Sequence, residues 1–79
     1  MSPTIFKIKN RKYFFFSNEE PRMHVHVSSP DGEAKFWIEP VVALATSEGF
    51  SPKLLKEIQK DVEDKYEEIK KAWKKHFKN

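Results

Sequence analysis

The side chains of this sequence best suited to chemistry are His24, His26 and Lys35, which lie on two short segments joined by a turn. Histidine titrates near neutral pH and can act as a general base, and lysine can stabilise negative charge that develops on a phosphate. Together these residues would suit metal-independent cleavage of RNA. Alternatively, His24 and His26 could chelate a metal ion, with Glu33 as the nearest third ligand, or could be structural histidines satisfied by their neighbours.

A β-hairpin over residues 23–38 would position these side chains. Its two halves alternate apolar and polar residues, and Pro30-Asp31-Gly32 between them is typical of a tight turn. A turn centred on Pro30-Asp31 sets four antiparallel pairs: Val27 with Ala34, Val25 with Phe36, His26 with Lys35, and His24 with Trp37. Because side chains alternate across a strand, the valines and Phe36 should face the C-terminal helix, and the other set should face away from it. That other set comprises His24, His26, Lys35 and Trp37.

Aromatic and basic residues are interleaved along the predicted strands and could form a binding surface. The set comprises Phe14, Phe16 and Trp37, interleaved with Lys7, Lys9, Lys12 and Lys35. Aromatic rings stack on bases and lysines contact phosphates, so this pattern suits single-stranded RNA or DNA. Aromatic residues are also enriched in protein interfaces, so a partner protein is the other interpretation of the same surface.

The N-terminal residues predict a second hairpin. Residues 5–9 and 12–16 are rich in isoleucine and aromatic side chains and flank residues 10–11, a spacing that suits a short turn. In the simple register, Phe6 lies opposite Phe15 and Ile8 lies opposite Tyr13. Consecutive aromatic residues through position 16 make this strand apolar on both faces, which favours a central strand or a covered one.

Residues 41–46 fit two structures. Val41 and Val42 favour a further strand, whereas Pro40 and the two alanines that follow suit a short helical turn. In either case Ser47-Glu48-Gly49 is expected to form a turn before the C-terminal helix.

The clearest element is a long helix over residues 52–77. Ser51 suits the N-cap and Pro52 suits the first helical position. Phe50 can pack on Leu55 as a hydrophobic staple. Apolar side chains then recur every three or four residues, which predicts one buried face. They are Leu55, Ile58, Val62, Tyr66, Ile69, Trp73 and Phe77.

These elements predict an α+β fold, in which an antiparallel β-meander of three or four strands is covered on one face by the long helix. A helix of about 26 residues is about 39 Å long, roughly twice the length of a six-residue strand. No proline or glycine follows Pro52 to kink it. We therefore expect Ile69, Trp73 and Phe77 to extend past the sheet and to pack on a second copy or on another protein.

Composition narrows the class of protein. The 79 residues form one expected domain, with the β-meander in 1–46 and the helix in 51–78. The sequence has no cysteine and no apolar run long enough to span a membrane, so we expect a cytoplasmic protein, and no cofactor is indicated. The net charge of +3 arises in residues 51–79, where nine lysines accompany six acidic residues. This excess is compatible with nucleic-acid binding and does not require it.

Ordered motifs run through nearly the whole chain. They are Pro3-Thr4-Ile5-Phe6, residues 13–19, His24-Val25-His26-Val27, residues 32–40, and Gly49-Phe50-Ser51 before the helix that carries Trp73. With these motifs the chain resembles a family of short bacterial and archaeal proteins of unknown function, often encoded beside another small gene. Arg22-Met23 departs from family members that have prolines before the first histidine. The resemblance implies a small-operon setting like that of toxin–antitoxin modules, without a settled activity.

Three functional hypotheses remain open at this point. The first is a regulatory partner protein of a small operon, which acts through protein contacts and, in one version, through nucleic acid. The second is a ribonuclease-like toxin that uses His24, His26 and Lys35. The third is a metal-binding protein that uses the two histidines.

Overall fold

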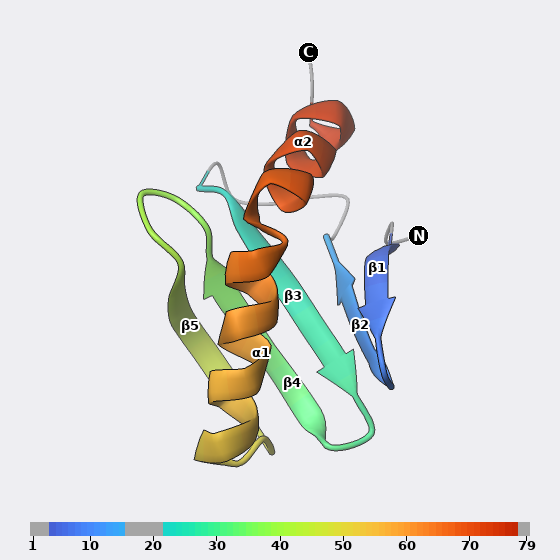
Figure 1. The fold of residues 1–79 in the computed structure, drawn as a ribbon, viewed down its shortest axis with the longest axis vertical. Helices are drawn as coiled ribbons and strands as arrows, with labels where there is room; N and C mark the ends of the chain where they lie inside the picture. The colour runs from blue at the N-terminus through green and yellow to red at the C-terminus, as the bar shows by residue number, and fades with distance from the viewer. Residues whose placement is uncertain (1–3, 16–21, 78–79) are drawn as a thin grey trace.

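The computed structural model describes residues 4–15 and 22–77, which form a five-stranded antiparallel sheet and two helices. The strands are neighbours in chain order, as in a meander (Figure 1). They are β1 (Thr4–Ile8), β2 (Arg11–Phe14), β3 (His24–Ser29), β4 (Gly32–Trp37) and β5 (Ala43–Glu48). The helices are α1 (Pro52–Asp64) and α2 (Tyr66–His76). The α+β class and the antiparallel meander are confirmed, but the predictions of three or four strands and of one helix are wrong.

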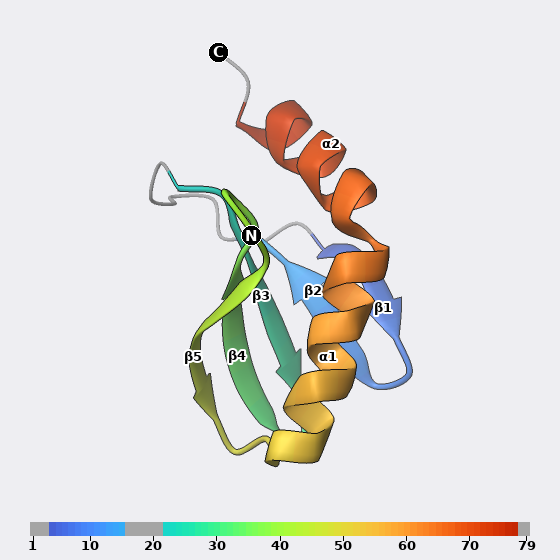
Figure 2. The ribbon, with the colours of Figure 1, turned by 60° about the vertical axis from the view of Figure 1, so that its left-hand side comes forward.

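The helix α1 lies across one face of the sheet, and α2 continues past the end at which β3 begins (Figures 1 and 2). The sheet buries alternate residues against α1 because successive strand side chains point to opposite faces. The core formed in this way includes Val25, Val27 and Phe36 from the sheet and Ile58 and Val62 from α1. The apolar stripe predicted for the helix is therefore an inside face of the protein.

The long helix predicted for residues 52–77 is broken at Lys65, whose φ of −101° and ψ of 16° interrupt the helical backbone. The break turns the apolar side of α2 toward the chain itself. Ile69 is fully buried, and Trp73 is 9% exposed and meets Phe15 edge-on with ring centroids 5.2 Å apart. Burying Ile69 and Trp73 contributes roughly 1.5–3 kcal/mol for each side chain. A helical hydrogen bond lost at the break costs roughly 1 kcal/mol net, so the burial can offset the interruption at Lys65. The helix therefore bends without proline or glycine.

This bend removes the physical reason for expecting the C-terminal half of the helix to pack on a second chain. Ile69 and Trp73 belong to the core of their own chain, and Phe77 is partly buried against that core. The large apolar side chains of the described part of α2 therefore pack within the chain.

The N-terminal hairpin is present, but its turn lies one residue earlier than predicted, because Lys9 adopts a φ of 56°. Phe6 therefore pairs with Tyr13, and Ile8 pairs with Arg11. Moving a turn by one residue shifts the pairing by two positions, so Phe6, Ile8 and Tyr13 keep their expected face. A register shift between Thr4 and Phe6 interrupts the alternation, and Ile5, expected on the other face, packs against the core.

Of residues 41–46, which fitted strand or helix, 43–46 belong to the edge strand β5, and Val41 and Val42 precede it. Ser47 and Glu48 also belong to β5, although the sequence predicts a turn there. The chain turns at Gly49, which has a φ of 92° and where a Cβ would lie 2.5 Å from the Asp31 carbonyl oxygen. Glycine suits this position because it has no side chain to strain or to collide.

The start of α1 is as predicted. The Ser51 Oγ accepts a hydrogen bond from the Leu54 N–H at 3.1 Å, and Pro52 begins the helix. Neither helix of the described residues has the length and apolar character needed to cross a membrane.

Candidate functional site

The register of the β3–β4 hairpin is the predicted one. The turn is held by a hydrogen bond from the Asp31 N–H to Ser29 Oγ at 3.1 Å. The four predicted pairs are present: Val25 with Phe36, Val27 with Ala34, His26 with Lys35, and His24 with Trp37. The pairing therefore brings the candidate chemical residues side by side.

The face of the sheet that points away from α1 carries most of the predicted binding residues. We call this the open face, because no helix in the described part of the chain crosses it (Figure 2). Along each strand, the residues of the open face alternate with residues buried on the other face, such as Tyr13, Val25, Val27 and Phe36. The open face comprises Lys7, Lys12, Phe14, His26, Ser28, Glu33, Lys35, Trp37, Thr46 and Glu48.

His24 departs from its predicted surroundings. It is fully buried, and its ring lies edge-on to Trp73 of α2 at 5.3 Å and to Trp37 at 5.7 Å between centroids. Its Nδ1 lies 2.7 Å from the Arg22 carbonyl oxygen, and because a carbonyl only accepts, Nδ1 donates this hydrogen bond. The expectation that His24 faces away from the C-terminal helix is wrong, because the bend at Lys65 brings α2 over it. His24 is therefore a buried side chain in contact with both tryptophans.

His26 is partly exposed on the open face. Its ring stacks on Phe14 with centroids 5.6 Å apart and an angle of 25° between ring planes. Lys35 lies directly across from it on β4. Both line a hollow of about 330 Å³ on the open face, to which Glu33 and Glu48 also contribute. The carboxylates of Glu33 and Glu48 could attract a cationic side chain of another molecule to this hollow.

Trp37 carries two cations over its ring. The Arg22 Cζ lies 4.1 Å and the Lys35 Nζ lies 4.5 Å from the ring centroid, within the range of cation–π attraction. The Arg22 Nε also donates to the Glu39 carbonyl oxygen at 3.0 Å, which fixes the guanidinium. This end of the open face therefore presents positive charge together with an aromatic ring.

The remaining predicted binding residues divide into three groups. Lys7 and Lys12 are exposed on the open face. Trp73 and Phe77 lie instead on α2, with ring centroids 4.3 Å apart, and belong to the packing around the core. Phe16 lies outside the described residues. The predicted set is therefore not a single surface.

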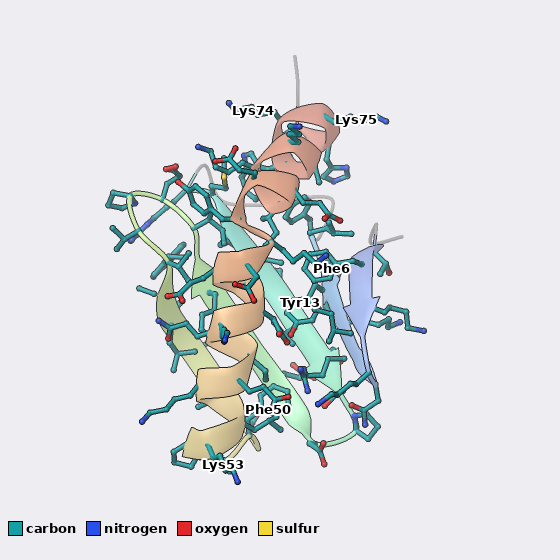
Figure 3. All side chains as sticks on the ribbon, in the orientation of Figure 1. Phe6, Tyr13, Phe50, Lys53, Lys74 and Lys75 are labelled. Atoms are coloured by element: carbon teal, nitrogen blue, oxygen red, sulfur yellow. The ribbon has the colours of Figure 1, made fainter. Side chains whose placement is uncertain are left out.

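A buried ion-pair network, which the sequence analysis missed, joins β2 to α1. Arg11 is 3% exposed, and its Nη2 donates to Asp61 Oδ2 at 2.7 Å and to Glu57 Oε2 at 3.2 Å. The Tyr13 hydroxyl donates to the same Asp61 oxygen at 2.9 Å and accepts from Arg11 Nε at 3.2 Å. Figure 3 shows Tyr13 between the sheet and α1.

The network alters the acidity of its members. Burial raises the pKa of Tyr13 to about 12. Burial alone would lower the pKa of Arg11, but its hydrogen bonds to Tyr13 and Asp61 raise that pKa above the ordinary value. The hydrogen bond from Lys9 lowers the pKa of Glu57. The sequence holds one signal for this network, since an arginine stands within an aromatic strand and two acids stand one helical turn apart.

The metal hypothesis requires a third ligand beside His24 and His26. Glu33, the predicted third ligand, pairs with Ser28 on the row of the sheet next to His26. Among residues 4–15 and 22–77, no group of three or more histidine, aspartate or glutamate side chains is placed to hold a metal ion.

Comparison with protein-family models gives a match over most of the chain. A family model described as "Domain of unknown function (DUF4160)" matches residues 11–74, which run from the start of β2 into α2. Comparisons with curated proteins and with solved structures found no match.

Proposed function

We propose, from the premise that this chain belongs to the DUF4160 family of unknown function, that it is an interaction protein whose open face binds a partner protein. The setting that fits this role is a small operon of the toxin–antitoxin type, in which one product regulates the other through a stable complex.

The composition of the open face supports this role. Phe14 and Trp37 are partly exposed there, and Arg22 and Lys35 lie over the Trp37 ring. Tryptophan and arginine are the residue types most enriched where protein interfaces concentrate their binding energy. A sheet face with such residues at one end suits a protein surface of complementary charge.

The same contacts favour protein over nucleic acid. Base stacking needs an accessible ring face, but Trp37 already holds Arg22 and Lys35, and Phe14 stacks on His26. A base would have to displace one of these groups. RNA or DNA contact through the lysines is therefore the secondary version of this proposal.

A ribonuclease is the alternative function, and one observation favours it. His26 and Lys35 are cross-strand neighbours and line the same hollow. His24, which the sequence places in the same catalytic set, is fully buried and could act only through His26 or Trp37. The metal-binding alternative would use His24 and His26, whose ring centroids lie 5.0 Å apart.

Co-expression with the product of the neighbouring gene tests the main proposal. We expect a complex that survives size-exclusion chromatography and that Lys35→Glu weakens about tenfold or more, because that charge lies within the interface. The matched control is Lys56→Glu, which makes the same charge change on the exposed side of α1 and should leave binding unchanged. Equal binding by the Lys35→Glu variant and the wild type would overturn the proposal for this face.

The same preparation separates the alternatives. RNA cleavage that His26→Ala abolishes without lowering the thermal stability would establish the ribonuclease. A zinc-binding heat that disappears in His24→Ala would establish the metal site. A stable complex that neither cleaves RNA nor binds zinc is the result expected for an interaction protein.

A further inference from the structure

One row of side chains on the open face has an unusual distribution of charge. The register of the sheet aligns a single residue from each strand, in order from β1 to β5. The row is Lys7, Lys12, Ser28, Glu33 and Glu48. Both lysines and both glutamates are exposed, so this charged row crosses the whole sheet from a positive to a negative end.

Both ends of the row place like charges directly opposite each other. Lys7 pairs with Lys12, and Glu33 pairs with Glu48. Like charges at directly opposed positions of neighbouring strands destabilise a sheet. Within residues 4–15 and 22–77, none of the four forms an ion pair with another side chain. A surface of another molecule that carries its charges in the opposite order, from negative to positive, would therefore relieve both repulsions.

We propose that this outside surface is a second copy of the chain, packed with its open face against the first. The inference rests on the proposed function, because it names a partner for the same face. A two-fold axis that runs along β3 between the two sheets places Lys12 over Glu33 of the second copy and Lys7 over Glu48 of the second copy. Ser28 then lies opposite its own counterpart. Face-to-face sheets lie about 10 Å apart, a gap that opposed lysine and glutamate side chains can span.

Other ways of stacking the two faces do not give this match. An axis perpendicular to the strands moves the charged row to the other end of the partner sheet, where Trp37 lies. The same perpendicular axis drawn through the row itself would place each lysine over the same lysine of the second copy. Only the axis along β3 exchanges the positive and negative ends, and it also makes the contact self-complementary, as a two-fold interface requires.

The shape of the open face agrees with this axis. A hollow of about 190 Å³ on one side of the face is lined by Lys12, Phe14 and Ser28, and the 330 Å³ hollow on the other side is lined by Glu33 and Glu48. Rotation about β3 brings the first hollow over the second. In this arrangement Lys12 of one copy would lie over the hollow of the other copy, which Glu33 and Glu48 line together with His26 and Lys35.

The area of the face limits the size of the contact. Strands about 4.8 Å apart and about six residues long give the open face a projected area of roughly 450 Å². Specific interfaces bury about 800 Å² per partner, so this contact falls at the weak end. We therefore expect a dimer with a dissociation constant in the micromolar range that a foreign partner of the same face can displace.

Sedimentation equilibrium with charge-reversed variants tests the arrangement. A two-fold interface repeats each contact, so Lys12→Glu or Glu33→Lys alone should weaken the dimer about tenfold or more. An equimolar mixture of the two variants should recover wild-type affinity. In the mixed dimer the two reversed positions face each other, and the unchanged Glu33 and Lys12 also face each other. Lys7→Glu mixed with Glu48→Lys provides a second pair if either first variant unfolds.

Lys56→Glu and Glu63→Lys on the exposed side of α1 are the matched controls, and their mixture should behave as the wild type does alone. A monomer at several hundred micromolar, or a mixture no stronger than its separate components, would overturn the inference. This failure differs from failure of the proposed function, because binding of the neighbouring gene product is measured separately. A monomeric wild type that still binds that product through Lys35 would leave the proposed function intact.

Discussion

The ion pair between Arg11 and Asp61 provides a direct test of how the sheet is held to α1. The Arg11 side chain is 4% exposed, the Asp61 side chain is 19% exposed, and the Nη2–Oδ2 distance is 2.7 Å. Asp61→Ala leaves the guanidinium with Glu57, which lies 3.2 Å away and has a 45% exposed side chain. Breaking a buried pair costs about 3–5 kcal/mol, and solvent access to the remaining partner reduces this to about 2–3 kcal/mol here.

Urea denaturation followed by tryptophan fluorescence measures this loss. With a slope of about 1 kcal/mol per molar urea for a small chain, the midpoint should fall by about 2–3 M. Asp64→Ala removes an exposed carboxylate from the end of α1 and is the control, with an expected change below about 0.5 kcal/mol.

A double variant separates an unpaired charge from a lost contact. Arg11→Met with Asp61→Leu removes both charges and keeps apolar volume, so it should be more stable than Asp61→Ala alone. A loss below about 1 kcal/mol in Asp61→Ala, or a double variant less stable than that single one, would refute the reasoning.

Three further predictions concern single residues. The pKa of Tyr13 is about 12 in the fold and about 10 in an unfolded chain. The folded state therefore keeps a proton that the unfolded state loses, and the free energy of unfolding should fall by roughly 2–3 kcal/mol between pH ~10 and ~12. Urea titrations of Tyr13→Phe should lack this fall. Ser51→Ala should lower the free energy of unfolding by about 1 kcal/mol, whereas Ser51→Asp should preserve the cap and the urea midpoint. Trp73→Ala should lower it by about 3–5 kcal/mol, and an unchanged melting temperature would show that the ring is not core packing.

Short-range patterns predicted the elements that short-range physics controls. The β3–β4 register was predictable because the turn at Pro30-Asp31 and the alternation of side chains act over a few residues. The Ser51 cap was predictable for the same reason. Two alanines after Val42 made residues 41–46 ambiguous, and pairing with β4 decides that they contribute to a strand.

The features that the sequence did not predict depend on residues far apart in the chain. Arg11 and Asp61 are 50 positions apart in the sequence. Trp73 in α2 contacts Phe15, which directly follows β2 near the other end of the chain. No local pattern distinguishes a long straight helix from one that bends at Lys65 to bury Trp73. The candidate site shows the same difference. The positions of His26, Lys35 and Trp37 were predictable from the alternation of strand side chains. The surroundings of His24 were not, because they depend on contact with the distant helix α2.

The bend at Lys65 also determines which part of the sheet a partner can reach. Where β3 begins, Trp73 packs on His24, and His24 in turn meets Trp37, so α2 occupies that end of the sheet. Where β3 ends, Ser28 lies in the charged row, and no described helix crosses that row. The proposed dimer uses the turn end of the open face, where the charges of the row would match those of a second copy.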